Sequence, residues 1–423
     1  MAETIATRAQ LLGMLKEVYG KRIAEQPNRT AFIMNFFDKS ETVPTGGKYW
    51  TEPLLDEGGQ AVGSYNEDEE TGDAQAENYK EIVIKPRQHY ALVRISGLSI
   101  ESSRSNLQAF VRAKDSEIKN KTKWLIAQLN VQFYGAGKGV LGSVFTTSAG
   151  DGGTVTMVAG TNMNWFRKGM RVDGYTLNLV TKRNTAGKRK GMEIATVNKV
   201  TRVITMKAGA SYEDVPAGLV VTDVLRFEDA GETTTAGADT QGKQLLGLAA
   251  QVDDVNEGDQ THQGVDRNVY TIFRGNRDHN SGVARPLSLD LMQKSIDVIN
   301  IESGEDPDFM IAGLGQRRNY ANLLWFDARY QPQRFAGGFK VLQYADLDFL
   351  VDKDCQLGRI YFGTKEYLQK YVVKPIGVLN GAGADMERIP KSDLYEMLIG
   401  GYFNLGCTRP NAWLKLVDLA EPA

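Results

Sequence analysis

The strongest constraint on the fold is one long stretch, residues 102–133, whose apolar side chains recur at helical spacing. No proline or glycine interrupts it before Gly135. The apolar positions fall at spacings of three, four and seven: Leu107, Phe110, Val111, Ile118, Leu125 and Leu129. This pattern predicts one amphipathic helix, which at 1.5 Å per residue would be about 45 Å long. Helices of globular proteins average about 11–12 residues, so a rod of this length cannot bury its apolar stripe within one compact domain.

Two segments that precede this helix also lack a place in a compact domain. Residues 1–40 look like an arm, in which a short amphipathic helix is expected at 8–19 and an uncovered extended run at 30–37. Residues 41–95 form a long polar excursion whose return limb alternates like a strand. We expect a two-stranded loop there, with a disordered surface loop as the alternative. Such a hairpin is marginal alone and needs a partner surface.

Residues 143–235 change to short alternating runs that are separated by glycine-rich turns. The expected strands are 154–158, 175–180, 193–197, 203–206 and 219–224. Several short strands at regular spacing indicate a small all-β unit. Because this unit lies between the long helix and a later mixed region, we interpret it as an insertion.

Residues 265–423 return to a mixture of helices and strands. The expected helices are 287–301, 315–326 and 391–398, and the expected strands are 309–312, 339–343, 348–351, 359–362, 401–405 and 413–417. The chain as a whole is therefore expected to be an α+β protein.

The composition excludes several classes of protein. The 423 residues include 50 Lys and Arg against 52 Asp and Glu, a net charge of −2, whereas a dedicated nucleic-acid binder is strongly basic. No run approaches the ~18–20 apolar residues that span a bilayer, and no signal segment opens the chain. Two cysteines, Cys355 and Cys407, cannot staple a chain of this length. Three scattered histidines without a Cys-x-x-Cys do not form a zinc motif.

The motifs that could carry chemistry lack the context that the chemistry needs. Gly137–Gly142 matches G-x-G-x-x-G, but it follows a helix and precedes the β unit, the reverse of a dinucleotide site. We expect a helix stop and a turn there. The basic residues Lys182, Arg183 and 188–190 favour a solvated hairpin tip over a polyanion site, because no aromatic residues are interleaved.

An acidic cluster is the remaining candidate for a cation site. It consists of Asp346, Asp348, Asp352 and Asp354, and its spacing fits no calcium loop. We therefore interpret it as a solvated strand edge. Together these motifs predict no catalytic residues, no cofactor-binding residues, no metal site and no enzymatic activity.

Three stretches resemble the major capsid proteins of tailed bacteriophages. Residues 93–103, VRISGLSIESS, look like the entry into that family's long spine helix, and residues 132–141, QFYGAGKGVL, look like its exit. Residues 409–416, RPNAWLKL, resemble the closing strand. The order of arm, loop, long helix and mixed remainder is similar to the family from end to end.

The resemblance implies the phage major capsid fold, an α+β wedge that encapsulin shells and the herpesvirus capsid floor share. Its parts would be an N-terminal arm at 1–40, an extended loop at 41–95, a peripheral domain with the spine helix at 96–142 and a β insertion domain at 143–240. Residues 241–423 would supply the rest of the peripheral domain, the axial domain and the closing strand.

The function implied by the resemblance is that of a major capsid protein, which self-assembles into the icosahedral head around a double-stranded DNA phage genome. Its partners would be copies of itself in hexamers and pentamers, a scaffolding protein, a portal and decoration proteins. It would contact DNA without sequence specificity, touch no membrane, assemble in the host cytoplasm and reside in the virion. The alternatives are an encapsulin-like shell around a protein cargo and a soluble enzyme of uncommon fold.

Opposite charges on the loop and the helix suggest one contact between subunits, since the family's extended loop lies across the adjacent subunit. The loop tip carries Glu67, Asp68, Glu69 and Glu70, and the polar side of the helix carries Arg112, Lys114, Lys119, Lys121 and Lys123. Four like charges on a thin hairpin repel one another, so the tip should not fold onto itself. These nine residues are the candidate inter-subunit contacts, with simple solvation of the tip as the alternative.

Overall fold

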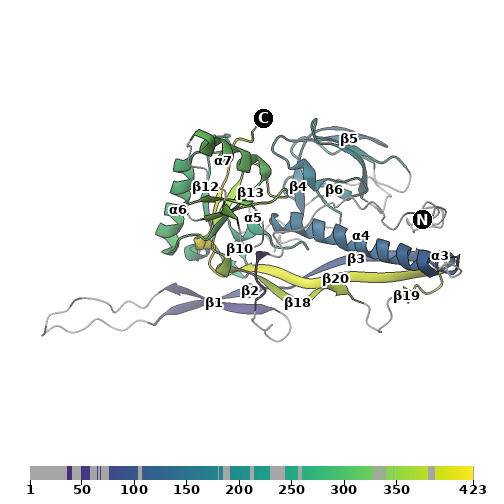
Figure 1. Ribbon diagram of the computed structural model, residues 1–423, viewed down its shortest axis with the longest axis horizontal. Coiled ribbons are helices and arrows are strands. Elements are labelled where there is room, and N and C mark those ends of the chain that lie inside the picture. Colours follow the sequence, from purple (N-terminus) through teal and green to yellow (C-terminus); the bar gives the residue numbers. More distant parts are fainter. Residues whose placement is uncertain are drawn as a thin grey trace.

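The computed structural model is an elongated α+β molecule, in which a mixed helix and strand body continues into a long helix that lies along a sheet (Figure 1). It describes residues 36–40, 49–57, 64, 67, 76–102, 107–179, 181–183, 191–209, 214–228, 243–255, 260–326, 333–334, 340–345, 347–379 and 386–422. Most of the expected arm, including the helix expected at 8–19, lies outside these residues.

The long helix expected from the sequence is present as α4 (Leu107–Phe133) and follows the short helix α3 (Gly97–Ser102). It runs along β3 (Arg87–Ser96) and β20 (Leu394–Cys407). Ile118 of the helix packs on four strand side chains, Val93, Ile95, Met397 and Ile399. The sheet therefore covers apolar surface that the helix could not bury by itself.

The helix expected at 391–398 is wrong, because residues 394–407 form the strand β20. One edge of β20 pairs antiparallel with β3, from Leu394 opposite Ser96 to Phe403 opposite Arg87. The other edge pairs with β18 (Leu368–Val378) and β19 (Glu387–Arg388). Backbone partners on both edges outweigh the helical spacing of so short a segment, because strand formation depends strongly on its surroundings.

A hairpin of two strands lies within the segment expected to form the loop. β1 (Trp50–Glu57) pairs antiparallel with β2 (Asn78–Ile84). Four of its side chains are buried against the body: Trp50, Leu54, Ile82 and Ile84 pack with Val265, Phe273 and Tyr371. This cluster fixes one end of the hairpin, while Leu55 and Tyr79 remain exposed.

A closed β-barrel follows α4, with the strand order β4-β5-β8-β7-β6-β9. Its strands are β4 (Val140–Ser148), β5 (Thr154–Met157), β6 (Arg171–Tyr175), β7 (Met192–Asn198), β8 (Val203–Met206) and β9 (Val224–Phe227). Closure leaves no free strand edge, so the barrel can hold its shape with few contacts to the rest of the chain.

Two barrel strands are displaced from their expected positions. The strands expected at 175–180 and 219–224 lie instead at 171–175 and 224–227. Turns occupy the expected residues, since Leu179 has φ 61° and Thr222 has φ 80°. Such left-handed values end a strand, and composition alone does not reveal them.

A seven-stranded sheet forms the mixed body, in the order β12-β21-β17-β13-β16-β15-β14. The strands are β12 (Asn276–Asp278), β13 (Phe309–Ala312), β14 (Gln333–Arg334), β15 (Lys340–Tyr344), β16 (Leu347–Val351), β17 (Ile360–Gly363) and β21 (Leu414–Leu416). Five of these were expected within one residue at each end.

The expected helices are present as α6 (Leu289–Ser303) and α7 (Leu314–Phe326). Short connecting elements are α5 (Leu248–Gln251), β10 (Thr261–His262) and β11 (Val265–Asp266).

The two faces of this sheet are covered differently. Met310 and Ala312 of β13 pack in one cluster with Met292 of α6 and Tyr320 of α7. The alternate residues of β13, including Phe309, belong to a larger core that also holds the end of α4 and the barrel interior. One sheet thus joins the body to the rest of the molecule through a single face.

Both cysteines are completely buried, which gives a direct test of the fold. Burial raises the pKa of Cys407 to about 12 and the pKa of Cys355 further above its ordinary value. Because the thiolate is the reactive form, we expect no modification of the folded protein by Ellman's reagent at about pH 8. Guanidinium chloride should make both thiols reactive. Rapid modification of either thiol without denaturant would contradict this packing.

Candidate functional site

The C-terminal end of α4 is joined to the seven-stranded sheet by side-chain hydrogen bonds. Asn130 Nδ2 donates to Asp352 Oδ2 at 3.1 Å and to Asp354 Oδ2 at 2.9 Å. The Tyr134 hydroxyl donates to Asp352 Oδ2 at 3.1 Å. Both aspartates lie in the turn between β16 and β17. The end of the long helix is therefore held in a fixed position on the body.

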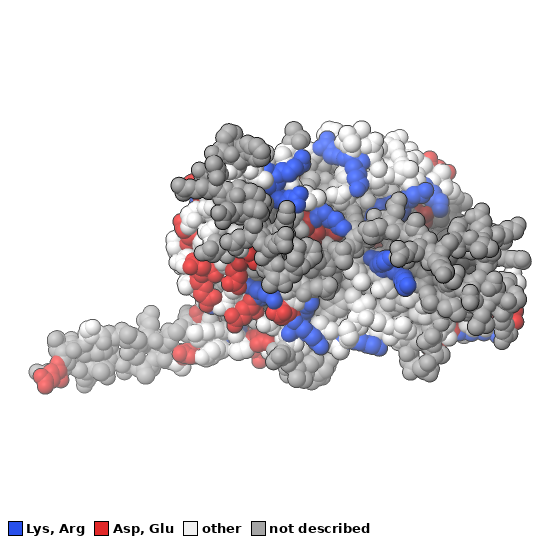
Figure 2. Space-filling view, viewed as in Figure 1, with Lys and Arg blue, Asp and Glu red and all other residues white. Residues whose placement is uncertain are grey.

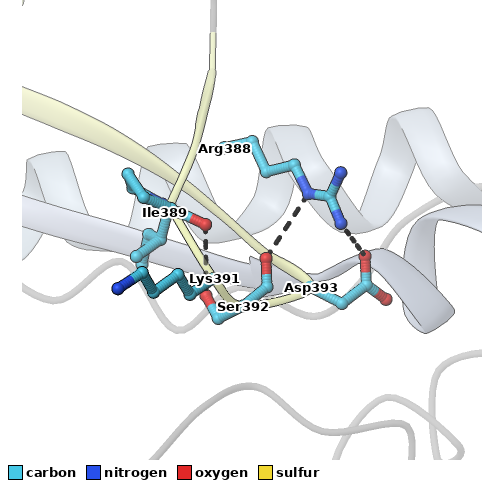
Figure 3. Close-up of a pocket in the computed structure, with 6 residues that line it drawn as sticks. Arg388, Ile389, Lys391, Ser392 and Asp393 are labelled. Atoms are coloured by element: carbon cyan, nitrogen blue, oxygen red, sulfur yellow. Dashed lines mark hydrogen bonds and ion pairs between the residues drawn. The ribbon is translucent and has the colours of Figure 1, made fainter.

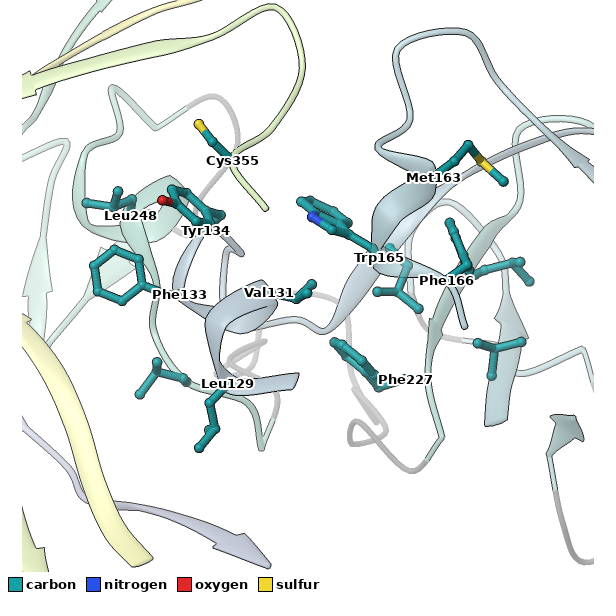
Figure 4. Close-up of a cluster of buried hydrophobic side chains, with 14 of the residues drawn as sticks. Leu129, Val131, Phe133, Tyr134, Met163, Trp165, Phe166, Phe227, Leu248 and Cys355 are labelled. Carbon is teal, nitrogen blue, oxygen red and sulfur yellow. The ribbon is translucent and has the colours of Figure 1, made fainter. Parts of the chain in front are cut away.

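The barrel is joined to the same turn. Asn162 Nδ2 donates to the carbonyl oxygens of Lys353 and Cys355 at 3.1 and 2.8 Å. Trp165 Nε1 donates to the Asp354 carbonyl at 2.9 Å. Figure 4 shows Tyr134 and Trp165 in the same buried cluster, with Cys355 of the turn near them. Helix, barrel and sheet thus meet at one turn.

The interpretation of this acidic cluster as a solvated strand edge is wrong for two of its members. Asp352 is 6% exposed and Asp354 is fully buried. Burial raises the pKa of Asp352, although the hydrogen bonds from Asn130 and Tyr134 oppose the rise. Among the described residues, no three His, Cys, Asp or Glu side chains are grouped to hold a metal ion. The donors around these aspartates make them a structural junction.

The described end of the arm enters the core through the rings of Phe36 and Phe37. Phe37 is buried, and its ring stacks on Phe133 of α4 with the centroids 5.4 Å apart. Phe309 and Trp413 lie around the same ring at 5.8 and 6.1 Å. The Ser40 backbone N–H then donates to the Lys370 carbonyl at 2.8 Å. The arm is therefore anchored where the long helix meets the seven-stranded sheet.

The other motifs singled out in the sequence have structural roles. Gly137 and Gly139 adopt φ 76° and 71° between α4 and β4, which confirms the expected helix stop and turn. Lys182 and Arg183 are paired with Asp173 and Asp223 at 2.9 and 3.1 Å, so their charge is largely compensated. The basic residues 188–190 lie outside the described residues.

A hollow at the turn between β19 and β20 is lined by residues 388–393 (Figure 3). Arg388 Nε donates to the Ser392 carbonyl at 3.4 Å, and its Nη2 lies 4.0 Å from Asp393 Oδ1. The Ser392 hydroxyl donates to the Ile389 carbonyl. These groups close the turn on itself and do not converge on a point where a substrate could react.

One face of the long sheet is open and partly apolar. Tyr90 and Leu92 of β3 point away from α4 and are 45% and 40% exposed. The Tyr90 ring meets Tyr402 of β20 edge to face at 6.1 Å. Beside them, Arg94 Nε lies 3.1 Å from Glu396 Oε2. Contiguous exposed apolar side chains with a polar border are typical of a protein contact surface, so this face is a candidate assembly surface.

The expected contact residues are only partly brought together. Glu67 is exposed, whereas residues 68–70 lie outside the described residues, as do the side chains of Arg112 and Lys114. Lys119 and Lys121 are both exposed on α4, but two residues correspond to about 200° around a helix. The cations therefore do not form one face: Lys119 and Lys123 share one side, and Lys121 shares the other with Trp124.

Sequence reasoning missed the polar residues that hold the junction together. Asn130 lies between Leu129 and Val131, where the helical pattern gives no reason for an amide. A polar residue at a core position of a predicted helix was the available signal, because buried polar groups require partners. Its partners lie 222 and 224 residues away in sequence, and no local pattern connects them.

The junction predicts a pH-dependent loss of stability in the variant Asn130→Asp. A third carboxylate beside Asp352 and Asp354 would be buried without compensation, which costs about 3–5 kcal/mol of unfolding free energy near pH 8. Its folded pKa would be raised above the unfolded value of about 3.9, so its destabilising effect is present above the folded pKa and disappears on acidification. Denaturant unfolding of the unassembled protein at about pH 8 and pH 5 measures both effects.

The matched control is Gln128→Glu, which adds the same charge two residues away at a partly exposed position of α4. We expect a change of at most about 0.5 kcal/mol for this surface variant. Equal stability of the two variants near pH 8, or a deficit of Asn130→Asp that grows on acidification, would contradict the proposed junction.

No helix in the described part of the chain is both long and apolar enough to cross a membrane. No protein-family model matches the sequence, and no curated protein sequence matches it. The structure, by contrast, has clear relatives in shape.

The structure is similar to those of capsid proteins over nearly its whole length. It matches a chain of the cyanophage A-1(L) capsid asymmetric unit with a TM-score of 0.55 and 11% identity, over 95% of this chain and 97% of that chain. It matches the capsid of a native GTA particle with a TM-score of 0.50 and 8% identity, over 99% and 100%. The holo-SrpI encapsulin complex from Synechococcus elongatus PCC 7942 is matched at 0.46 and 9%, over 98% and 96%. The first two matches, with TM-scores of 0.55 and 0.50, show that the chain has the phage major capsid fold.

Proposed function

We propose that this protein is the major capsid protein of a tailed bacteriophage, a structural subunit that self-assembles into the icosahedral head around double-stranded DNA. The observation that carries the proposal is the capsid fold over 95% of this chain and 97% of the cyanophage capsid subunit. The polar groups at the junction and in the hollow of the β19–β20 turn have structural roles, which accords with a protein that is not an enzyme.

The parts of the chain suit a subunit that holds its neighbours through many modest contacts. We assign residues 1–40 as the arm, 41–95 as the extended loop, 96–142 as the peripheral domain with the spine helix, 143–240 as the insertion domain and 241–423 as the remainder with the axial domain. Arm and loop would lie on neighbouring subunits, and the open face of the long sheet offers them apolar surface. A net charge of −2 permits dense packing without strong repulsion.

The partners proposed from this role are other copies of the chain in hexamers and pentamers, a scaffolding protein, a portal and decoration proteins. Assembly would occur in the host cytoplasm and the finished subunit would reside in the virion. An encapsulin-like shell is the second candidate, and the contents of purified shells separate the two: nucleic acid in the first case, a protein cargo in the second.

The proposal predicts that the purified protein forms closed shells or capsomer-sized oligomers, alone or with a co-expressed scaffolding protein. The hairpin and the open sheet face expose apolar side chains that only further subunits would cover. Electron microscopy and light scattering measure the outcome. A monodisperse monomer of 46.7 kDa at every concentration, with scaffold present, would contradict the proposed function.

A second prediction concerns the acidic tip, for which we propose a contact with the side of α4 that carries Lys119 and Lys123. An exposed ion pair contributes only ~0.2–1 kcal/mol, but the contact would recur in every subunit and weaken with salt. The double variant Glu69→Lys and Glu70→Lys should therefore lower assembly yield and shift the salt midpoint of assembly.

The control is the double reversal Glu366→Lys and Glu387→Lys, which makes the same change of charge at exposed positions on other elements. If the tip variant assembles with the same yield and salt midpoint as this control, the tip is solvated and the contact does not exist. The capsid role would stand in that case.

A further inference from the structure

The side of α4 that carries Lys121 continues onto the barrel as one cationic surface. We define this surface by five residues: Lys121 of α4, Arg167 and Lys168 beside the short helix at Met163–Trp165, and Lys199 and Arg202 in the turn between β7 and β8. Three of these, Lys121, Lys168 and Lys199, are exposed. The surface joins two elements that the sequence does not place together.

Two contacts bring these residues together. The guanidinium of Arg167 lies over the ring of Trp124, 5.4 Å from its centroid, and Trp124 lies one helical turn from Lys121. Lys199 Nζ donates to Asn164 Oδ1 at 2.9 Å, which brings the β7–β8 turn beside the residues that precede Arg167. Arg202 ends that turn with φ 59°. The cations thus occupy positions that neighbouring side chains and the backbone already fix.

Little negative charge opposes this surface among the described residues. The nearby barrel carboxylates are engaged elsewhere: Glu193 with Arg171 and Lys207, Asp173 with Lys182, and Asp223 with Arg183. Glu117, one turn before Lys121, is the acidic residue on that side of α4. In Figure 2, blue side chains are scattered over the barrel, the body and the lower edge of the molecule, whereas red side chains gather near α6. A chain with a net charge of −2 therefore presents a locally basic surface.

We propose that this surface binds the phosphate backbone of duplex DNA without sequence specificity, an inference that rests on the proposed capsid function. Phosphate contacts by Lys and Arg give sequence-independent affinity through the release of counterions. Arg167 is already held on the face of Trp124, so less conformational freedom is lost on binding than for a free side chain. Trp124 is 46% exposed and lies beside Arg167, where it can make an apolar contact with the sugars of the DNA backbone. Binding of packaged DNA requires this side of α4 and of the barrel to face the interior of the head.

An acidic protein segment is the competing ligand, because it offers the same sign of charge. The placement of the cations favours a polyanion: they come from α4 and from two segments of the barrel, so the positive charge is spread out, and the phosphates of duplex DNA are spread in the same way. The test therefore includes a synthetic peptide of residues 64–72, which carries the four acidic residues of the loop tip.

The experiment measures binding of the unassembled protein to a short labelled DNA duplex by fluorescence anisotropy over a range of salt concentrations. The test variant is Lys168→Glu with Lys199→Glu, two exposed lysines whose replacement leaves the core intact. The matched control is Lys374→Glu with Lys391→Glu, which makes the same change of charge at exposed lysines of β18 and the β19–β20 turn. Circular dichroism verifies that both variants are folded.

We expect the test variant to lose at least about tenfold in affinity and to show a salt slope shallower by about 2, since each phosphate contact contributes about 0.9. The control should bind as the unaltered protein does. Equal binding by the test variant and the control would overturn the proposal, and so would tight binding of the peptide to a protein that does not bind the duplex. Electron microscopy tests the capsid function separately. If the unaltered protein forms no shells, the capsid function is contradicted. If it forms shells and the test variant keeps its DNA affinity, only the proposed DNA-binding surface is contradicted.

Discussion

The hydrogen bonds at the turn between β16 and β17 determine how the long helix, the barrel and the seven-stranded sheet are oriented. Each of the first two elements sends an amide and an aromatic donor to the same few backbone and carboxylate oxygens: Asn130 and Tyr134, and Asn162 and Trp165. In a buried site, unmade hydrogen bonds are costly, so a polar network of this kind permits one arrangement far more readily than any other. Apolar packing alone would hold these elements together with less definite angles.

Periodicity in the sequence predicted the elements whose apolar pattern is complete within themselves. The helix α4, the strand β13 and the helices of the mixed body have such patterns. β20 does not, because Leu394, Met397 and Leu398 fit a helix locally and become a strand only beside β3, some 300 residues away, as the 302-residue separation between Arg94 and Glu396 illustrates. The interpretation of the acidic cluster was wrong for the same reason, because Asp352 and Asp354 are buried by residues from distant parts of the chain.

Charge in this protein is described better by its placement than by its sum. The near-neutral total hides cations on the barrel and α4 and carboxylates around α6. Five cations were also expected on one side of the helix, although the repeat of 3.6 residues puts Lys119 and Lys121 on different sides. Distinct flanks of one rigid helix can thereby present charge to different partners at the same time.

The packing of α4 on the sheet of β3 and β20 has a mechanical consequence. At about 1.5 Å per helical residue and 3.3 Å per strand residue, the 27 residues of α4 and the 14 of β20 extend about 40 and 46 Å. The helix packs on the sheet of β3 and β20 through Ile118, and two packed layers of nearly equal length resist bending better than either layer alone. The register of β18 shifts between Val372 and Lys374 and again between Lys374 and Gly377, around Pro375. The β18 edge of β20 is therefore bonded less regularly than the opposite edge, where the pairing with β3 runs from Leu394 to Phe403 without a register shift.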